Sequence, residues 1–176
     1  MTSGGRAATR VLGVYTAPVP SYSADMRITT WAEYGVICAL HLAKRREDGP
    51  VTGRDVARRE KLPPDYVEQI LLRMRRAGIV TSTRGARGGY ELARPASDIT
   101  VREIITAAEL MTFDLHCESH PVDDVRCSAA HECSIRPVWI MLQRRIDEVL
   151  DGVHLADLLE AEPQVRQRVG LPVLQV

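Results

Sequence analysis

The amino-acid sequence predicts a mainly α-helical fold that contains one small β-hairpin. Three observations lead to this prediction. Apolar residues recur at spacings of three and four through several segments, Gly and Pro turns separate these segments, and one stretch instead places three glycines between two short β-prone runs. The chain has 176 residues, of which 45% are hydrophobic, so one domain of ordinary size with a packed core is expected.

The first 25 residues are expected to form a disordered arm, because they are rich in Gly, Ser, Ala, Thr and Pro and show no periodicity. An alternative interpretation is that Met26 is the true start. No stretch of the sequence approaches the roughly 18 apolar residues that span a bilayer, and the apolar run near the start is shorter than the ~7–15 residues of a secretory signal. We therefore expect a cytoplasmic protein with no membrane partner.

Three helices are expected before the hairpin. The first covers Thr30 to Lys44, where apolar residues recur every three or four positions. A short second helix follows Thr52, which starts a motif resembling a capping box. The third begins at Pro63 or Pro64, since the missing N–H of proline costs nothing in the first turn, and it ends near Ala77. Its predicted apolar face consists of Val67, Ile70, Leu71 and Met74.

The hairpin is expected from two short strands, residues 79–83 and 90–93. Between them lie Arg84 to Gly89, where three glycines in six residues permit a tight turn. Helix, turn, helix and then hairpin is the order of a winged helix-turn-helix, which we place at residues 26–98.

A long helix is expected after a cysteine-containing loop. Thr100 and Glu103 predict a capping box that starts a linking helix, and residues 99–134 then include an irregular loop with three of the four cysteines. The long helix runs from about Ile135 to Leu150, and a last small helix completes a dimerisation region at 135–162, followed by a tail at 163–176. Apolar residues of the long helix alternate steps of four and three, as in a short dimer seam. The seam consists of Ile135, Trp139, Leu142, Ile146 and Val149.

Basic residues are concentrated in the predicted winged helix. Residues 51–95 hold ten basic and five acidic residues, a formal charge of +5 in a chain whose net charge is zero. Nine of the ten are Arg, which suits bidentate contacts with phosphate and guanine. A solvated helix face would also explain such a charge run. The order of elements and the Arg-Gly hairpin favour DNA binding, since an arginine at the base of a wing can enter a minor groove.

The cysteines of the loop predict a metal or redox site. Cys117, Cys127 and Cys133 are separated by nine and five residues, and soft thiolates suit zinc or an iron–sulfur cluster. The spacing alone leaves zinc, a cluster and plain redox thiols as alternatives. Cys38 lies on the apolar face of the first helix, where a small buried residue is the simpler interpretation. An enzyme is not expected, because the sequence offers no Ser/His/Asp or paired-acid constellation and no phosphate loop.

Several stretches of the chain match a known family. The most specific is the wing, Arg-Gly-x-x-Gly-Gly-Tyr at residues 84–90; the others are residues 26–29, 66–71, 77–80 and 155–158. From Met26 to about Glu160 the chain resembles the Rrf-two family of winged-helix transcriptional regulators, which includes IscR-like and NsrR-like iron–sulfur sensors. The resemblance implies a homodimer with a long dimerisation helix.

The resemblance also implies a 2Fe–2S or 4Fe–4S cluster between the subunits, and the three cysteines of the loop fall on the family's ligands. IscR-like members place a His three residues after the third cysteine, where this chain has Arg136. NsrR-like members take a carboxylate from the first helix of the other subunit, and Glu33 falls on that position. Glu33 is therefore the implied fourth ligand. An exposed helix-start carboxylate is its simpler interpretation, and His131 is the competing ligand.

For DNA, the resemblance implies contacts from the third helix and the wing. A Glu can accept a hydrogen bond from cytosine N4, and a Gln can pair with adenine. The implied contacts are Asp65, Glu68, Gln69 and Arg84, and we add Tyr66, Arg73 and Arg87. The predicted protein is a regulator, specifically a repressor, that binds a double-stranded operator and is switched by a cluster sensing nitric oxide, redox or iron–sulfur status. The alternative is a zinc-binding or thiol-based winged-helix regulator without a cluster.

Overall fold

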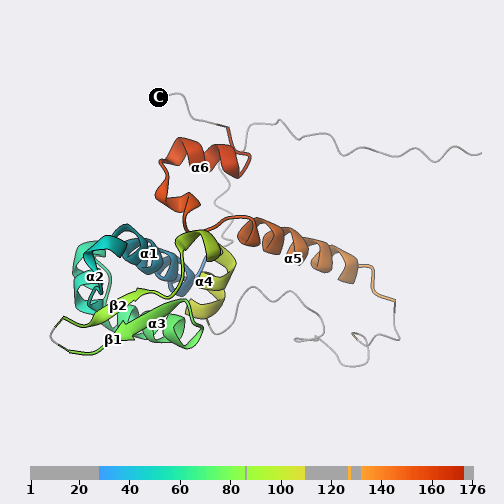
Figure 1. Cartoon of the computed structure of the whole chain (residues 1–176). Helices are drawn as coiled ribbons and strands as arrows, with labels where there is room; N and C mark the ends of the chain where they lie inside the picture. The colour runs from blue at the N-terminus through green and yellow to red at the C-terminus, as the bar shows by residue number, and fades with distance from the viewer. Residues whose placement is uncertain (1–27, 86, 110–126, 128–131, 173–176) are drawn as a thin grey trace, which may run out of the picture.

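The computed structural model describes residues 28–85, 87–109, 127 and 132–172 (Figure 1). Within these residues the chain forms α-helices, short 3-10 helices (η) and one antiparallel hairpin. The elements are α1 (Thr30–Lys44), η1 (Arg46–Asp48), α2 (Gly53–Glu60), α3 (Pro64–Arg76), β1 (Val80–Thr83), β2 (Gly89–Leu92), η2 (Ala96–Asp98), α4 (Val101–Ala108), α5 (Arg136–Asp151), η3 (Asp157–Leu159) and α6 (Glu162–Arg168). The predicted fold class, mainly α with a winged helix-turn-helix and a long helix after it, is confirmed.

The helix boundaries follow from local chemistry. The side chain of Thr29 accepts a hydrogen bond from the backbone N–H of Ala32 and begins α1, and that of Thr52 accepts from Asp55 and begins α2. Pro64 occupies the first turn of α3. Between α2 and α3, Lys61 adopts a left-handed conformation with φ 56°, which closes α2 and turns the chain into the second helix of the motif.

The hydrophobic core fixes the orientation of α3. Its predicted apolar face is confirmed, because Val67, Ile70, Leu71 and Met74 are all fully buried. They belong to one cluster with residues of α1, α2 and α4. Burying one large aliphatic side chain contributes about 1.5–3 kcal/mol, so this inner face holds α3 firmly and determines which residues face outward.

The wing is attached to the helical body through Val51. The strands pair from Val80 with Leu92 to Thr83 with Gly89, and each begins one residue away from its predicted start. Val51 exchanges two backbone hydrogen bonds with Tyr90, of 2.9 and 2.8 Å. A Cβ atom on Gly89 would lie 2.6 Å from the backbone of Val51, so only glycine permits this close approach.

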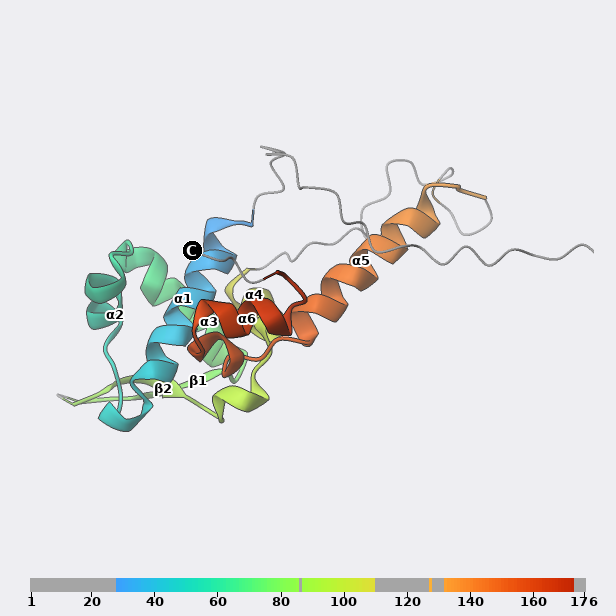
Figure 2. The same ribbon diagram turned by 90° about the horizontal axis from the view of Figure 1, so that it is seen from above.

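Helix α5 extends away from the winged-helix body (Figure 2). The predicted capping box of Thr100 and Glu103 begins α4. Arg102 of α4 then forms ion pairs with Asp147 (3.3 Å) and Asp151 (2.8 Å) of α5. After α5 the chain returns to the body, where the backbone N–H of Leu155 donates to the carbonyl of Ile99 (2.8 Å).

The C-terminal part differs in detail from the prediction. The small helix expected at residues 155–159 is the shorter η3, and residues 163–176, expected as a tail, contain most of α6. Among the described residues, no helix combines the length and the apolar character that crossing a membrane requires.

Candidate nucleic-acid interface and metal centre

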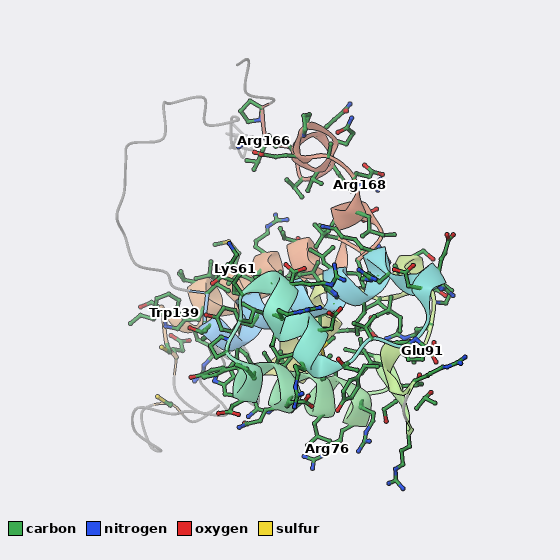
Figure 3. All side chains as sticks on the ribbon, turned by 90° about the vertical axis from the view of Figure 1, so that its left-hand side faces the viewer. Lys61, Arg76, Glu91, Trp139, Arg166 and Arg168 are labelled. Carbon is green, nitrogen blue, oxygen red and sulfur yellow. The ribbon has the colours of Figure 1, made fainter. Side chains whose placement is uncertain are left out.

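The outer face of α3, opposite its buried face, is formed by four residues. At 3.6 residues per turn these are Asp65, Gln69, Leu72 and Arg76. Asp65, Gln69 and Arg76 are exposed and Leu72 is half-buried. Figure 3 shows Arg76 pointing away from the body. Arg76 was not among the predicted DNA contacts, although the helical period from Asp65 and Gln69 leads to it.

One flank of α3 packs against α1 and α4. The ring of Tyr66 lies 4.6 Å from that of Trp31 and 6.0 Å from that of Tyr34, between ring centroids. The guanidinium of Arg73 lies over the Trp31 ring, 4.1 Å from its centroid, and donates a hydrogen bond of 2.6 Å to the carbonyl of Ala108. Tyr66 and Arg73, both predicted at the DNA, are thus also engaged within the chain.

The other flank of α3 faces the wing. Arg75 donates a hydrogen bond to the hydroxyl of Ser82 in β1 (3.1 Å), and the hydroxyl of Tyr90 in β2 donates to Glu68 Oε2 (3.5 Å). Burial raises the pKa of Tyr90, the negative charge of Glu68 raises it further, and Arg75 opposes both effects. The phenol therefore stays protonated and can donate to Glu68 at neutral pH.

The wing carries two exposed arginines at its turn. Arg84 and Arg87 flank the tip of the hairpin, which extends beyond the helices (Figure 1). In the part of the chain that the structure describes, neither forms an ion pair. Their charges are therefore open to an anionic partner, as is that of Arg76.

The described cysteines of the loop lie beside the start of α5. Cys127 and Cys133 are both half-buried, and Arg136 donates a hydrogen bond of 3.0 Å to the carbonyl of Cys127. Cys117 and His131 lie outside the described residues. Within the described ranges, no three His, Cys, Asp or Glu side chains gather as a metal site.

Two carboxylates at the ends of helices are further candidate ligands, one at the start of α1 and one at the end of α4. Glu33 is exposed in the first turn of α1. Glu109 ends α4 and is only 8% exposed; burial raises its pKa, while a hydrogen bond from the backbone of Ala32 opposes the rise. The sequence gives no signal for Glu109, because its burial depends on how α4 meets α1.

The chemistry of these donors fits the implied cluster. Thiolates are the usual ligands of iron–sulfur clusters, and the two described cysteines lie in a segment attached to α5. Arg136 cannot be a ligand, because a guanidinium has no acceptor lone pair. Its observed role is to hold the backbone of Cys127.

A helix-turn-helix is followed by a β-hairpin, and the outer face of α3 presents exposed polar residues. This arrangement defines a winged-helix DNA-binding protein. The chain belongs to the Rrf2 family, described as an iron-dependent transcriptional regulator, whose sequence model matches residues 28–161.

Named relatives agree with this assignment. The regulator IscR of Yersinia pseudotuberculosis is 34% identical over 134 residues, which is 76% of this chain and 79% of that protein. Among solved structures, T. potens IscR superimposes with a TM-score of 0.61 at 35% identity, covering 77% of this chain and 87% of that one. CymR of B. subtilis, described as the global cysteine regulator, superimposes with a TM-score of 0.61 at 33% identity, covering 76% and 96%. The Yersinia relative is described as an HTH-type transcriptional regulator.

Proposed function

We propose that this protein is a homodimeric, DNA-binding repressor whose operator affinity is switched by an iron–sulfur cluster. The observation that carries the proposal is the outer face of α3. Its polar residues are exposed, its inner face is locked in the core, and two arginines extend from the wing beside it. A rigid helix with this presentation suits a major groove, and an Arg-bearing wing suits the adjacent backbone or minor groove.

The homodimer is supported by the apolar surface of α5. Large hydrophobic residues of α5 and the residue before it are between 40% and 59% exposed in the single chain. They are Ile135, Val138, Trp139, Ile140, Met141 and Val149. At 3.6 residues per turn, Ile135, Val138, Trp139 and Val149 lie on one face of the helix, whereas Ile140 and Met141 lie off it. An exposed apolar face of this kind is typical of an interface, and a second copy of the same helix offers a matching face.

The cluster is assigned to Cys117, Cys127 and Cys133, with Glu33 from the partner subunit as the fourth ligand. In one protomer α5 runs away from the body that contains α1, so a carboxylate from α1 of the other subunit is the more natural donor (Figure 2). When bound, the cluster supplies iron that nitric oxide or oxidants can attack. A carboxylate is a hard ligand and a poor match for sulfur-bound iron, which favours a labile site.

The chain's own residues connect the loop to the recognition helix. Arg73 of α3 is bonded to the carbonyl of Ala108, and the segment with the cysteines begins directly after Glu109. A change in the position of that segment is therefore expected to shift α3. In a dimer this would alter the distance between the two recognition helices. Loss of the cluster shifts the equilibrium between two such arrangements.

Anaerobic purification followed by an absorption spectrum and iron and sulfide analysis tests the cluster. We expect visible absorption and stoichiometric iron and sulfide, both lost in Cys117→Ser, Cys127→Ser and Cys133→Ser but retained in Cys38→Ser.

Glu33→Ala should alter the spectrum or the stability of the cluster while DNA binding of the apoprotein persists. The matched control is Glu47→Ala, an exposed carboxylate in η1. If His131→Ala changes the spectrum and Glu33→Ala does not, the cross-subunit ligand is wrong.

A thiol switch without iron is the second candidate function, supported by the similarity to CymR, described as a cysteine regulator. It predicts purified protein without iron or sulfide whose DNA binding changes with an oxidant and recovers with a thiol reductant.

A zinc site, colourless and without redox chemistry, predicts zinc in the metal analysis and no response to the oxidant.

A further inference from the structure

The carboxylate of Glu68 is in contact with two other elements. Gly53, the first residue of α2, is buried, and a Cβ atom built on it would lie 2.3 Å from Glu68 Oε1 and 2.8 Å from Glu68 Cδ. The side chain of Glu68 thus lies directly on the backbone of Gly53. From the wing, the hydroxyl of Tyr90 donates a hydrogen bond of 3.5 Å to Glu68 Oε2.

Both contacts hold the carboxylate in a favourable place. The first turn of a helix carries partial positive charge, so the start of α2 attracts a negative group. Tyr90 is itself fixed, because it exchanges both backbone hydrogen bonds with Val51. Glu68 as a residue remains exposed, so the carboxylate is held at the surface, at the edge of the outer face of α3.

Restraining a glutamate matters for recognition. A free Glu side chain has several rotatable bonds and loses conformational entropy when it forms a directed hydrogen bond. A carboxylate already fixed by its neighbours avoids much of this loss, and it discriminates more sharply because it cannot move to accommodate a wrong base.

We propose that Gly53 and Tyr90 are positioning residues that set the base preference of the recognition helix by holding the Glu68 carboxylate. The wing thereby takes part in base reading without touching the base, through Tyr90. This inference rests on the proposed function, in which α3 reads DNA. It assigns a role to two residues that contact Glu68 rather than the operator.

The structure offers a clean way to disturb this arrangement. Gly53 does not have a positive φ, and the added Cβ of Gly53→Ala would clash with the flexible end of Glu68, so the backbone can remain in place. Tyr90→Phe removes only the hydroxyl that donates to Glu68. Both changes should leave folding intact and act on DNA recognition through Glu68.

The test uses the full-length protein and duplexes selected by it from a randomised library. Affinities are measured for the selected duplex, for its single-base-pair variants and for random DNA. We expect Glu68→Ala to relax discrimination at one or two base pairs on the order of tenfold. Tyr90→Phe and Gly53→Ala should relax discrimination at those same base pairs, with unchanged affinity for random DNA. Neither change should add to Glu68→Ala in the double variants.

Two results would overturn the inference. If Tyr90→Phe weakens binding to every duplex alike, or still acts in the Glu68→Ala background, Tyr90 contacts DNA itself or only supports the fold. If the wild-type protein selects no duplex at all, the proposed function fails, and the inference fails with it. The first result leaves the proposed function standing, so the two failures are distinguishable.

Discussion

The side chain of Arg73 donates a hydrogen bond of 2.6 Å to the backbone carbonyl of Ala108. This bond joins the recognition helix to the end of α4, where the chain enters the segment with the cysteines. The same guanidinium lies 4.1 Å from the centroid of the Trp31 ring. One arginine therefore links three helices on the flank of α3 away from the wing.

We expect Arg73→Ala to lower the free energy of unfolding by about 2 kcal/mol, because it removes a charged hydrogen bond and a cation–π contact. Arg76→Ala is the matched control on the same helix. It should change the free energy of unfolding by no more than about 0.5 kcal/mol. It should also lower the slope of log DNA affinity against log salt concentration by about 1, the amount expected for one lost phosphate contact. Urea unfolding and salt titrations measure both. If Arg73→Ala keeps the wild-type stability and its DNA affinity depends less steeply on salt, then Arg73 contacts a DNA phosphate directly.

Arg84→Ala should weaken operator binding by on the order of 1–3 kcal/mol, since Arg84 is exposed beside the tip of the wing. The measurement is a titration against operator and random duplexes at fixed salt. The control is Arg94→Ala, because Arg94 is bonded to Glu103 within the chain (2.6 Å) and should change stability rather than DNA affinity. Unchanged affinity of Arg84→Ala for both duplexes would show that the wing does not read DNA.

Trp139→Glu should convert the dimer to a monomer without unfolding it. Trp139 is 40% exposed in the single chain, so a charge is tolerated there in a monomer but not inside an apolar interface. Sedimentation at micromolar concentration gives the oligomeric state, and circular dichroism gives the fold. Arg144→Ala, an exposed change on the same helix, should remain dimeric. A wild-type monomer under these conditions would contradict the assignment of α5.

Cys38 should be inert toward alkylation in the native protein. Burial, with a smaller contribution from the charge of Glu60, raises the pKa of Cys38 from 9.0 to about 12. At pH 8 the thiol is therefore neutral and inaccessible, whereas Cys127 and Cys133 are half-buried. Iodoacetamide labelling of the apoprotein followed by mass spectrometry should modify those two first. Early modification of Cys38 would contradict its burial.

The same raised pKa makes stability depend on pH. Above pH 9 the unfolded thiol loses its proton while the folded one keeps it, so the free energy of unfolding falls as pH rises toward 12. The slope from this group reaches about 1.4 kcal/mol for each pH unit. Denaturant unfolding of wild type and Cys38→Ala between pH 8 and 10 isolates this effect. The free energy of unfolding of the wild type minus that of Cys38→Ala should fall as pH rises, and a constant difference would contradict the raised pKa.

Much of the fold could be predicted because local patterns determine it. The apolar period of α3 places this helix within about one residue of its observed bounds, and the capping box of Thr100 correctly places the start of α4. Helix α6 has no such period; only Val165 and Arg166 of its seven residues are half-buried, and an ion pair between Arg166 and Glu162 supports it instead. A pattern-based prediction therefore has little to detect there.

The candidate site was less accessible to prediction. The outward position of Asp65 and Gln69 follows from the helical period, but the contact of Glu68 with Gly53 does not. Residues 53, 68 and 90 meet only because the wing returns to Val51 and α2 crosses α3. Likewise, nothing in the spacing of residues 73 and 108 indicates that Arg73 bonds to α4, since this contact depends on how the helices pack.

The attachment of α5 has a mechanical consequence. Arg102 holds this 16-residue helix near its C-terminal end, through Asp147 and Asp151. At 1.5 Å per residue the helix is about 24 Å long, so a tilt of about 5° at Arg102 displaces the opposite end by about 2 Å. The helix thus has the geometry of a lever arm, attached beside α4 and with its far end beside Cys133. Any tilt of α5 about this attachment would therefore be smallest at α4 and largest beside Cys133.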